Sequence, residues 1–187
     1  FDGKLRFSYN KRLLPNYDVF DEHRYFFNGT DIGVYKLIYN NTKIKIGLQI
    51  CEDLWDDNQE LKVSEEQKEN GAEILINISA SPFSIGKLEK RIKLIKKKIK
   101  ELRLPFIYCN MVGAQDEIIF DGSSLAFSDN GGLVKQAEYF KECISIINFN
   151  MKKSSAVIFQ KKEKKIFNAL WLGVSDYFSK TGHKEAV

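Results

Sequence analysis

The sequence predicts an α/β fold built around a mixed sheet, and three observations support this prediction. Short apolar runs alternate with helical patterns through the middle of the chain, as in strand–helix–strand units. Two pairs of strand-like runs are joined by turn-forming segments, at Asn40-Asn41 and at 129–132, which favours antiparallel hairpins. The chain has 187 residues, of which 43% are hydrophobic, so it can form one packed domain of ordinary size.

The first fifty residues are predicted to form a strand, a loop and a hairpin. Leu5, Phe7 and Tyr9 alternate with polar residues, which predicts a strand that ends near Lys11. Pro15 and the turn formers around it end regular structure and open a loop rich in aromatic residues. The ranges are 5–9 for the strand, 14–27 for the loop, and 34–38 and 42–50 for the hairpin.

The middle of the chain is predicted to contain two helices that alternate with buried strands. The clearest helix covers 87–103, because apolar residues fall at helical spacing along one of its faces. Those residues are Leu88, Ile92, Ile95, Ile99 and Leu102. The other segments are a helix over 59–70 that Gly71 ends, strands over 73–78 and 104–108, and a loop over 110–117.

The last third is predicted to return to antiparallel strands before a final helix. The strands cover 118–120, 124–127, 133–137 and 143–149, and the helix follows residue 161 and runs through 177. A lysine-rich polar stretch over 152–165 marks the edge of the domain. We therefore divide the chain into a domain over 1–150 and a domain edge with a linker helix over 151–187.

The composition argues against several classes of partner. A formal net charge of +4, from 29 basic and 25 acidic residues, is too weak to indicate nucleic-acid binding. No metal site is expected, because the three cysteines show no CxxC spacing and the two histidines lie far apart. The cysteine usage and the lack of a signal peptide or bilayer-length apolar run predict a cytoplasmic protein without a membrane partner. Cys109 and Cys143 are interpreted as buried and inert.

Cys51 is the strongest candidate for a catalytic residue. It follows the apolar run 44–50, so its thiol lies at the end of a predicted strand. Two carboxylates and an indole come directly after it, from Glu52, Asp53 and Trp55. Most free cysteines are small buried hydrophobes, but these surroundings suit a nucleophile that is presented to a pocket.

Hydrolysis of an amide by a thiol requires a stabilised thiolate, a proton for the leaving amine and a stabilised oxyanion. His23 and His183 lie in no pattern that would form a cysteine–histidine pair. A lysine and a glutamate can supply the same functions, since the ammonium stabilises the negative charges and the carboxylate moves the proton. Lys11, at the end of a predicted strand, is the candidate lysine.

Five blocks of the sequence, in order, closely resemble the amidase domain of glutamine-dependent NAD synthetases, which is of the carbon–nitrogen hydrolase (nitrilase) superfamily. The first two are KRLLPNYDVFDEHRYF at 11–26 and the nucleophile motif CEDLW at 51–55. The others are 77–87, 110–123 and 168–182, and the last resembles the linker helix that leads into the synthetase domain. The resemblance implies a nitrilase-like αββα four-layer sandwich with mixed sheets, incomplete at its N-terminus, that forms a homo-oligomer.

The resemblance also implies a role for each site residue. Cys51 would attack the side-chain amide of L-glutamine, giving a thioester and ammonia. Lys11 would stabilise the tetrahedral oxyanion, and Glu22 would orient Lys11 or the attacking water. Four residues match positions near the bound glutamine, and they are Tyr17, Glu52, Ser81 and Lys87.

Two parts of the family's pattern are absent from the sequence. The general-base glutamate lies upstream of the lysine in the family, yet no glutamate occurs among the ten residues before Lys11. The ATP-binding loop of the synthetase domain is expected after the tail, but the sequence ends at Val187. The resemblance therefore implies part of a longer enzyme. This part would need no cofactor and would be inactive alone, while Mg-ATP and nicotinic acid adenine dinucleotide would bind to the other domain.

Alternatives remain for both the function and the residues. The protein could be a stand-alone carbon–nitrogen hydrolase acting on a small amide or nitrile, or a non-catalytic lysine-rich binding fragment. The lysines of 87–103 are interpreted as a solvated face, since the interleaved aromatics of single-strand binders are missing. Glu22 could pair with Arg24 or Arg12 at the surface, and Ser81 could cap the helix that starts near Lys87.

Overall fold

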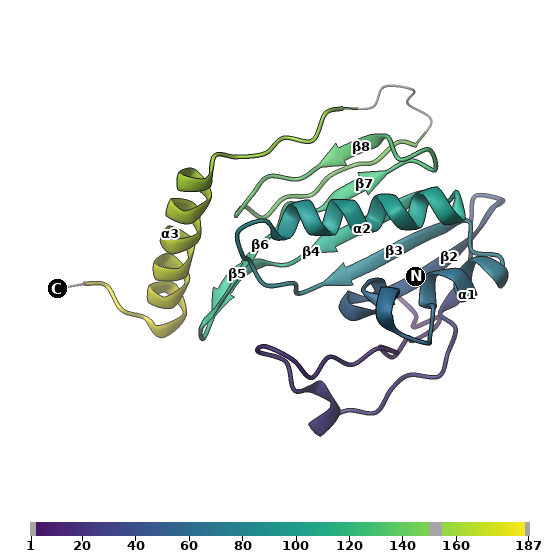
Figure 1. Ribbon diagram of the computed structural model, residues 1–187, viewed down its shortest axis with the longest axis horizontal. Helices are drawn as coiled ribbons and strands as arrows, with labels where there is room; N and C mark the ends of the chain where they lie inside the picture. The colour runs from purple at the N-terminus through teal and green to yellow at the C-terminus, as the bar shows by residue number, and fades with distance from the viewer. Residues whose placement is uncertain (1–2, 150–154, 186–187) are drawn as a thin grey trace.

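The computed structural model describes residues 3–149 and 155–185, and its main body is a six-stranded mixed sheet (Figure 1). Its strand order is β1-β2-β3-β4-β7-β8. The strands are β1 (Val34–Tyr39), β2 (Thr42–Ile50), β3 (Ile74–Ser79), β4 (Phe106–Asn110), β7 (Leu125–Phe127) and β8 (Leu133–Gln136). β2, β3 and β4 are mutually parallel, while β1, β7 and β8 pair antiparallel with their neighbours. The sheet is therefore mixed, as predicted.

Helices α1 (Val63–Glu69) and α2 (Lys87–Leu102) cover one face of this sheet (Figure 1). α2 begins after Gly86, which has a positive φ of 82°, and ends before Arg103, which has a φ of 55°. Its apolar stripe packs on the sheet, where Ile95 and Ile99 are 0% and 2% exposed. The core between α2 and the sheet also holds Phe106, Tyr108 and Phe127. The helix predicted from apolar spacing is thus confirmed almost residue for residue.

A second, two-stranded sheet and the last helix lie at one end of the molecule (Figure 1). β5 (Val112–Gln115) and β6 (Ile118–Asp121) form an antiparallel hairpin, and α3 (Lys162–Thr181) packs against it. The side chain of Asp176 accepts a hydrogen bond from the Ala114 backbone N–H at 2.7 Å, which fixes α3 to β5. The predicted final helix is confirmed and extends four residues past 177.

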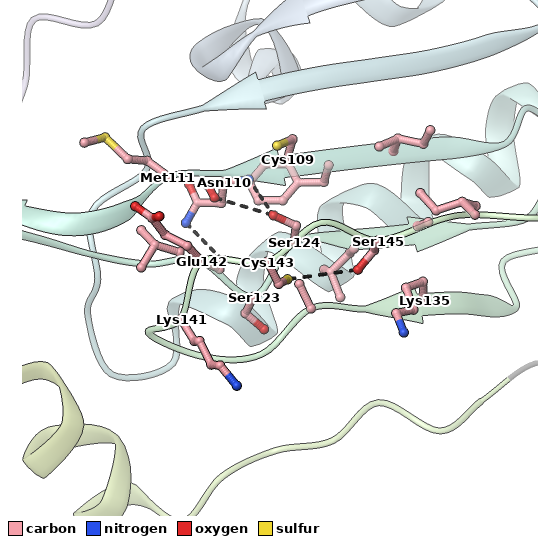
Figure 2. A pocket seen from close by; sticks show the side chains of 18 residues that line it. Cys109, Asn110, Met111, Ser123, Ser124, Lys135, Lys141, Glu142, Cys143 and Ser145 are labelled. Atoms are coloured by element: carbon pink, nitrogen blue, oxygen red, sulfur yellow. Dashed lines mark hydrogen bonds between the residues drawn. The ribbon is translucent and has the colours of Figure 1, made fainter. Parts of the chain in front are cut away.

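The opposite face of the six-stranded sheet is apolar and remains partly open. Side chains alternate along a strand, so Ile107 and Cys109 point away from the face that α2 covers. Ile78 on β3 is 53% exposed on that side. A cavity of about 590 Å³ lies there, lined from β4, β7, β8 and the segment 141–147 (Figure 2). Cys109 and Cys143 both line it and are exposed, so their interpretation as buried residues is wrong.

Two predicted strands do not form. Residues 5–9 make no ladder in the described part of the chain, and side chains fix this segment instead. Phe7 stacks on Tyr35 with ring centroids 3.9 Å apart. The segment 143–149 also lies outside every strand, and its Ile144 and Ile146 are 100% and 94% exposed. Alternation alone predicted both strands, but neither segment has a pairing partner among the described residues.

Two further boundaries differ from the prediction. The loop predicted over 110–117 contains β5, whose residues pair with β6 across a turn in which Asp116 has a φ of 50°. The helix predicted from residue 59 starts only at Val63. Before it, the ammonium of Lys62 binds the carbonyl oxygens of Asp56 and Asp57 at 2.7 and 2.8 Å, which holds a short 3-10 turn in place.

The fold is therefore mixed α/β with a mixed sheet. The described residues supply one large sheet and one helix layer, which correspond to two of the four layers of the predicted sandwich. The predicted domain boundary at 150/151 lies outside the described residues.

Candidate active site

The candidate site lies where the three parallel strands end. Ile50 on β2 pairs with Ile78 on β3, and Ser79 pairs with Asn110 on β4. Cys51, the residue after Ile50, therefore stands in a row with the ends of the two neighbouring strands. Ligands of open α/β sheets bind at the carboxyl ends of the strands, so this edge is where the topology favours a site.

Cys51 occupies a strained turn. It opens the 3-10 helix η2 (Cys51–Leu54) and has a φ of 45°, in the left-handed region that disfavours side chains. A hydrogen bond within the turn stabilises it, because the buried Asp53 accepts the Ile50 N–H at 2.9 Å. The chain thus changes direction sharply at the thiol, as expected for a nucleophile displayed at a strand end.

Lys11 and Glu22 form an ion pair near this turn. The Lys11 Nζ lies 2.7 Å from both carboxylate oxygens of Glu22, and the Lys11 side chain is 12% exposed. Glu22 begins the short 3-10 helix η1 (Glu22–Arg24). The surface alternatives for Glu22 are wrong, because Arg24 pairs with Asp21 instead. Lys11 lies outside every strand of the described residues, so its predicted position at a strand end is also wrong.

The charges around Cys51 act on its thiol in opposite directions. Burial raises the pKa of Cys51 and is the largest influence on it. The Lys11 ammonium and a hydrogen bond from Ser79 lower this pKa, whereas the carboxylates of Glu52 and Glu22 raise it. Lys11 is therefore the cation that favours the thiolate, the ionic form that attacks a carbonyl carbon.

Glu52 and Tyr17 form a second polar pair beside Cys51. The Tyr17 hydroxyl donates to the two Glu52 oxygens at 2.8 and 2.7 Å, and Glu52 is 7% exposed. Burial raises the pKa of Glu52, while Tyr17, Lys11 and Lys87 lower it. Burial likewise raises the pKa of the Tyr17 hydroxyl, with the Glu52 bond adding to this shift.

Lys87, at the start of α2, faces the same region. Its Nζ lies 4.6 Å from the centre of the Trp55 ring, within cation–π distance. Burial and the neighbouring Arg91 lower the pKa of Lys87, whereas Cys51 and Glu52 raise it. Glu52 and Lys87 thus place opposite charges close to the thiol, an arrangement that suits a zwitterionic amino acid.

Ser81 is buried, and its hydroxyl accepts hydrogen bonds from Arg91 at 3.3 Å (Nε) and 3.1 Å (Nη2). Its backbone N–H donates to the Asn110 side chain at 3.0 Å. The helix-capping interpretation is wrong, because Gly86 is the residue before α2 and no side chain caps that helix. Ser81 therefore fixes the loop between β3 and α2 to Arg91 and Asn110.

Sequence reasoning missed two buried cations on α2, Arg91 and Lys98. Arg91 is 0% exposed, and its guanidinium pairs with Asp121 at 2.8 Å. The prediction that Lys98 belongs to a solvated lysine face is wrong, because Lys98 is 1% exposed and pairs with Asp56 at 2.6 Å. Arg91 and Lys98 are seven residues apart, so they share the buried face of α2 with Ile95; this spacing was the available signal.

Among the described residues, no group of three or more histidine, cysteine, aspartate or glutamate side chains could hold a metal ion. None of the described helices combines the length and the apolar character needed to cross a bilayer.

The thiol chemistry of Cys51 gives a first testable prediction. Alkylation of Cys51 by iodoacetamide should accelerate as the pH rises above 7, because burial raises the thiol pKa and the thiolate fraction grows toward it. Lys11→Met removes the cation that lowers this pKa, so alkylation at pH 8 should slow about tenfold, equivalent to one pKa unit.

The rates should be measured by peptide mass spectrometry, which separates Cys51 from Cys109 and Cys143. Lys36→Met, at an exposed lysine of β1, is the matched control and should react like the wild type. A wild-type alkylation rate in Lys11→Met would contradict the electrostatic role of Lys11.

Comparisons with known proteins agree with this geometry. The family model described as carbon-nitrogen hydrolase matches residues 2–159. The glutamine-dependent NAD(+) synthetase of Synechocystis sp. is 34% identical over 99% of this chain and 35% of its own length. That of Thermotoga maritima is 36% identical over 80% of this chain and 25% of its own length. The chain thus spans about a third or less of the curated relatives that it matches.

Solved structures give the same result. The glutamine-dependent NAD+ synthetase of Acinetobacter baumannii in complex with ADP has a TM-score of 0.81 and 31% identity, over 97% of this chain and 34% of that one. A carbon-nitrogen hydrolase of Helicobacter pylori has a TM-score of 0.61 and 26% identity, over 72% of this chain and 49% of that one. The sequence match, the fold and the lysine beside a strand-end cysteine agree, and this chain belongs to the carbon–nitrogen hydrolase family.

Proposed function

We propose that this chain is the glutaminase part of a glutamine-dependent NAD synthetase. It would hydrolyse L-glutamine and supply ammonia for the ATP-dependent amidation of nicotinic acid adenine dinucleotide to NAD. One observation carries the proposal: the Lys11 ammonium lies close enough to the Cys51 thiol to lower its pKa. It occurs in a chain that is 34% identical to such a synthetase over 99% of its length.

The chemistry follows from the groups present. The Cys51 thiolate attacks the side-chain amide carbon of glutamine, so a carbon–sulfur bond forms and the carbonyl oxygen becomes negative. Lys11 stabilises this oxyanion, and Glu22 holds the Lys11 Nζ in place through two 2.7 Å contacts. The carbon–nitrogen bond then breaks and ammonia leaves after accepting a proton. Water hydrolyses the thioester, which gives glutamate and restores the thiol.

The neighbouring residues suit recognition of the amino acid. Glu52, held by the Tyr17 hydroxyl, is the proposed partner of the glutamine α-amino group. Lys87, held over the Trp55 ring, is the proposed partner of the α-carboxylate. Ser81 supports the loop that faces them, since its hydroxyl is held by Arg91. We infer that these contacts select a zwitterionic substrate over a simple amide.

The rest of the reaction is proposed to occur outside this chain. No step through ATP is assigned to the described residues, among which no group of three or more histidine, cysteine, aspartate or glutamate side chains could hold a metal ion. The proton-transferring glutamate is likewise expected from another segment. We propose that the protein forms a homo-oligomer. We also propose a cytoplasmic location, because the cysteines of the described residues are free.

The test follows nitrogen from substrate to product in the protein expressed at the full length of its gene. The wild type is incubated with nicotinic acid adenine dinucleotide, Mg-ATP and either glutamine labelled with ¹⁵N in its amide or unlabelled ammonium. We expect NAD from both, with the label in the carboxamide when glutamine is the donor. NAD from ammonium alone would reject the glutaminase, and NAD from neither would favour a stand-alone amidase.

A further inference from the structure

The Asp53 carboxylate lies between the two segments that carry the site and accepts four hydrogen bonds. Asp53 is 0% exposed, and no ion pair within the described residues includes its carboxylate. One oxygen accepts the backbone N–H groups of Arg12 at 3.0 Å and Leu13 at 2.9 Å. The other accepts the Ile50 N–H at 2.9 Å and the Tyr9 hydroxyl at 2.9 Å.

These four donors flank the two reactive side chains. Ile50 directly precedes Cys51, in the turn where the nucleophile has its positive φ of 45°. Tyr9 and Arg12 lie on either side of Lys11, two residues before it and one after it. The same carboxylate therefore fixes the backbone of the nucleophile and the backbone of the cation, which are forty residues apart in sequence.

The other bonds of the Lys11 segment lead elsewhere. The Lys11 carbonyl accepts the Gly29 N–H at 2.8 Å, and the Arg12 carbonyl accepts the Asn28 amide at 2.6 Å. Both hold the segment to the loop at 28–29, not to the Cys51 turn. Among the described residues, Asp53 joins the cation to the nucleophile, because its two carboxyl oxygens accept all four hydrogen bonds.

The ionised form of Asp53 matches this set of donors. Burial raises the pKa of Asp53, and the hydrogen bonds from Ile50, Leu13, Tyr9 and Arg12 oppose this effect. A carboxylate can accept four hydrogen bonds on its two oxygens, whereas an amide would direct two hydrogens at one pair of these donors. Asparagine at this position would therefore repel either the Arg12–Leu13 side or the Ile50–Tyr9 side.

We propose that Asp53 is a positioning residue, which sets the distance between the Lys11 ammonium and the Cys51 thiol without touching the substrate. This inference rests on the proposed glutaminase function. Displacement of reacting groups by about 1 Å costs on the order of 100-fold in rate, so Asp53→Asn should act mainly on kcat.

The experiment measures glutamate release from L-glutamine and Cys51 alkylation by iodoacetamide in the full-length protein. Asp53→Asn should lower kcat about 100-fold, leave KM close to wild type and slow Cys51 alkylation toward the rate of Lys11→Met. Asp56→Asn is the matched control. Asp56 is equally buried but pairs with Lys98 on α2, so this variant should lose thermal stability and keep its kcat.

A third variant covers a failure of Asp53→Asn to fold, as judged by circular dichroism at the assay temperature. Tyr9→Phe removes one of the four donors and should lower kcat about threefold to tenfold, the loss expected for one hydrogen bond. Wild-type kcat in Tyr9→Phe, or equal losses of kcat in Asp53→Asn and Asp56→Asn, would overturn the proposal. If the wild type releases no glutamate, the glutaminase function fails, and the alkylation rates still decide whether Asp53 positions Lys11.

Discussion

Cys51→Ala is expected to abolish NAD formation from glutamine while leaving NAD formation from ammonium close to the wild-type rate. The substitution removes the sulfur that forms the thioester, and no other described thiol can replace it. Cys109 and Cys143 line the cavity on the open face of the sheet (Figure 2), and Lys11 is not among the residues that line this cavity. Removal of a catalytic nucleophile costs on the order of 10⁶-fold in kcat, so the residual glutamine-driven rate should fall below detection.

The measurement compares initial rates of NAD formation with each nitrogen source in the full-length protein. Cys109→Ala is the matched control and should keep both rates, since Cys109 lies outside the site. Loss of the ammonium-driven rate as well would mean that the alanine disturbs the whole protein. Retention of the glutamine-driven rate would remove Cys51 from the mechanism.

Arg91→Met is expected to lower the free energy of unfolding by about 3–5 kcal/mol, the usual cost of leaving one member of a buried ion pair alone. The Arg91 guanidinium is fully buried and donates five hydrogen bonds, which depend on its charge and its fork of N–H groups. It pairs with Asp121 at 2.8 Å and donates to the Ser81 carbonyl at 2.8 Å. Methionine fills similar space but leaves the Asp121 carboxylate buried without its cation.

Urea unfolding followed by circular dichroism should report this loss. Lys90→Met is the control, because Lys90 is exposed on the same helix and should change the stability by less than about 0.5 kcal/mol. Arg91→Met should also raise KM for glutamine, since Arg91 holds the Ser81 loop that faces Lys87. Wild-type stability in Arg91→Met would show that the pair contributes nothing net.

Local signals in the sequence were sufficient for much of the fold. The Asn40-Asn41 turn carries positive φ angles of 46° and 62°, so its hairpin followed from the residue types alone. The stripe along 87–102 predicted α2, and the apolar run before Cys51 predicted β2 and the thiol at its end. Each of these three predictions depends only on residues that are close together in the sequence.

The errors concern contacts between distant segments. Residues 5–9 and 143–149 alternate like strands, but a strand also needs a neighbour to pair with. Lys98 belonged by type to a lysine-rich surface, and only the fold brings Asp56 to it at 2.6 Å. Asp53 could not be distinguished from Glu52 in the sequence, although Asp53 fixes two backbone segments and Glu52 accepts hydrogen bonds from the Tyr17 hydroxyl.

The two tryptophans of this chain occupy opposite environments. Trp55 is half-buried four residues after Cys51, with the Lys87 ammonium 4.6 Å from its ring, whereas Trp171 on α3 is 68% exposed. Indole emission depends on nearby charge and on contact with water. The protein therefore carries an intrinsic fluorescent reporter beside the candidate site. A quencher dissolved in water should reduce the emission of the exposed Trp171 more than that of the half-buried Trp55.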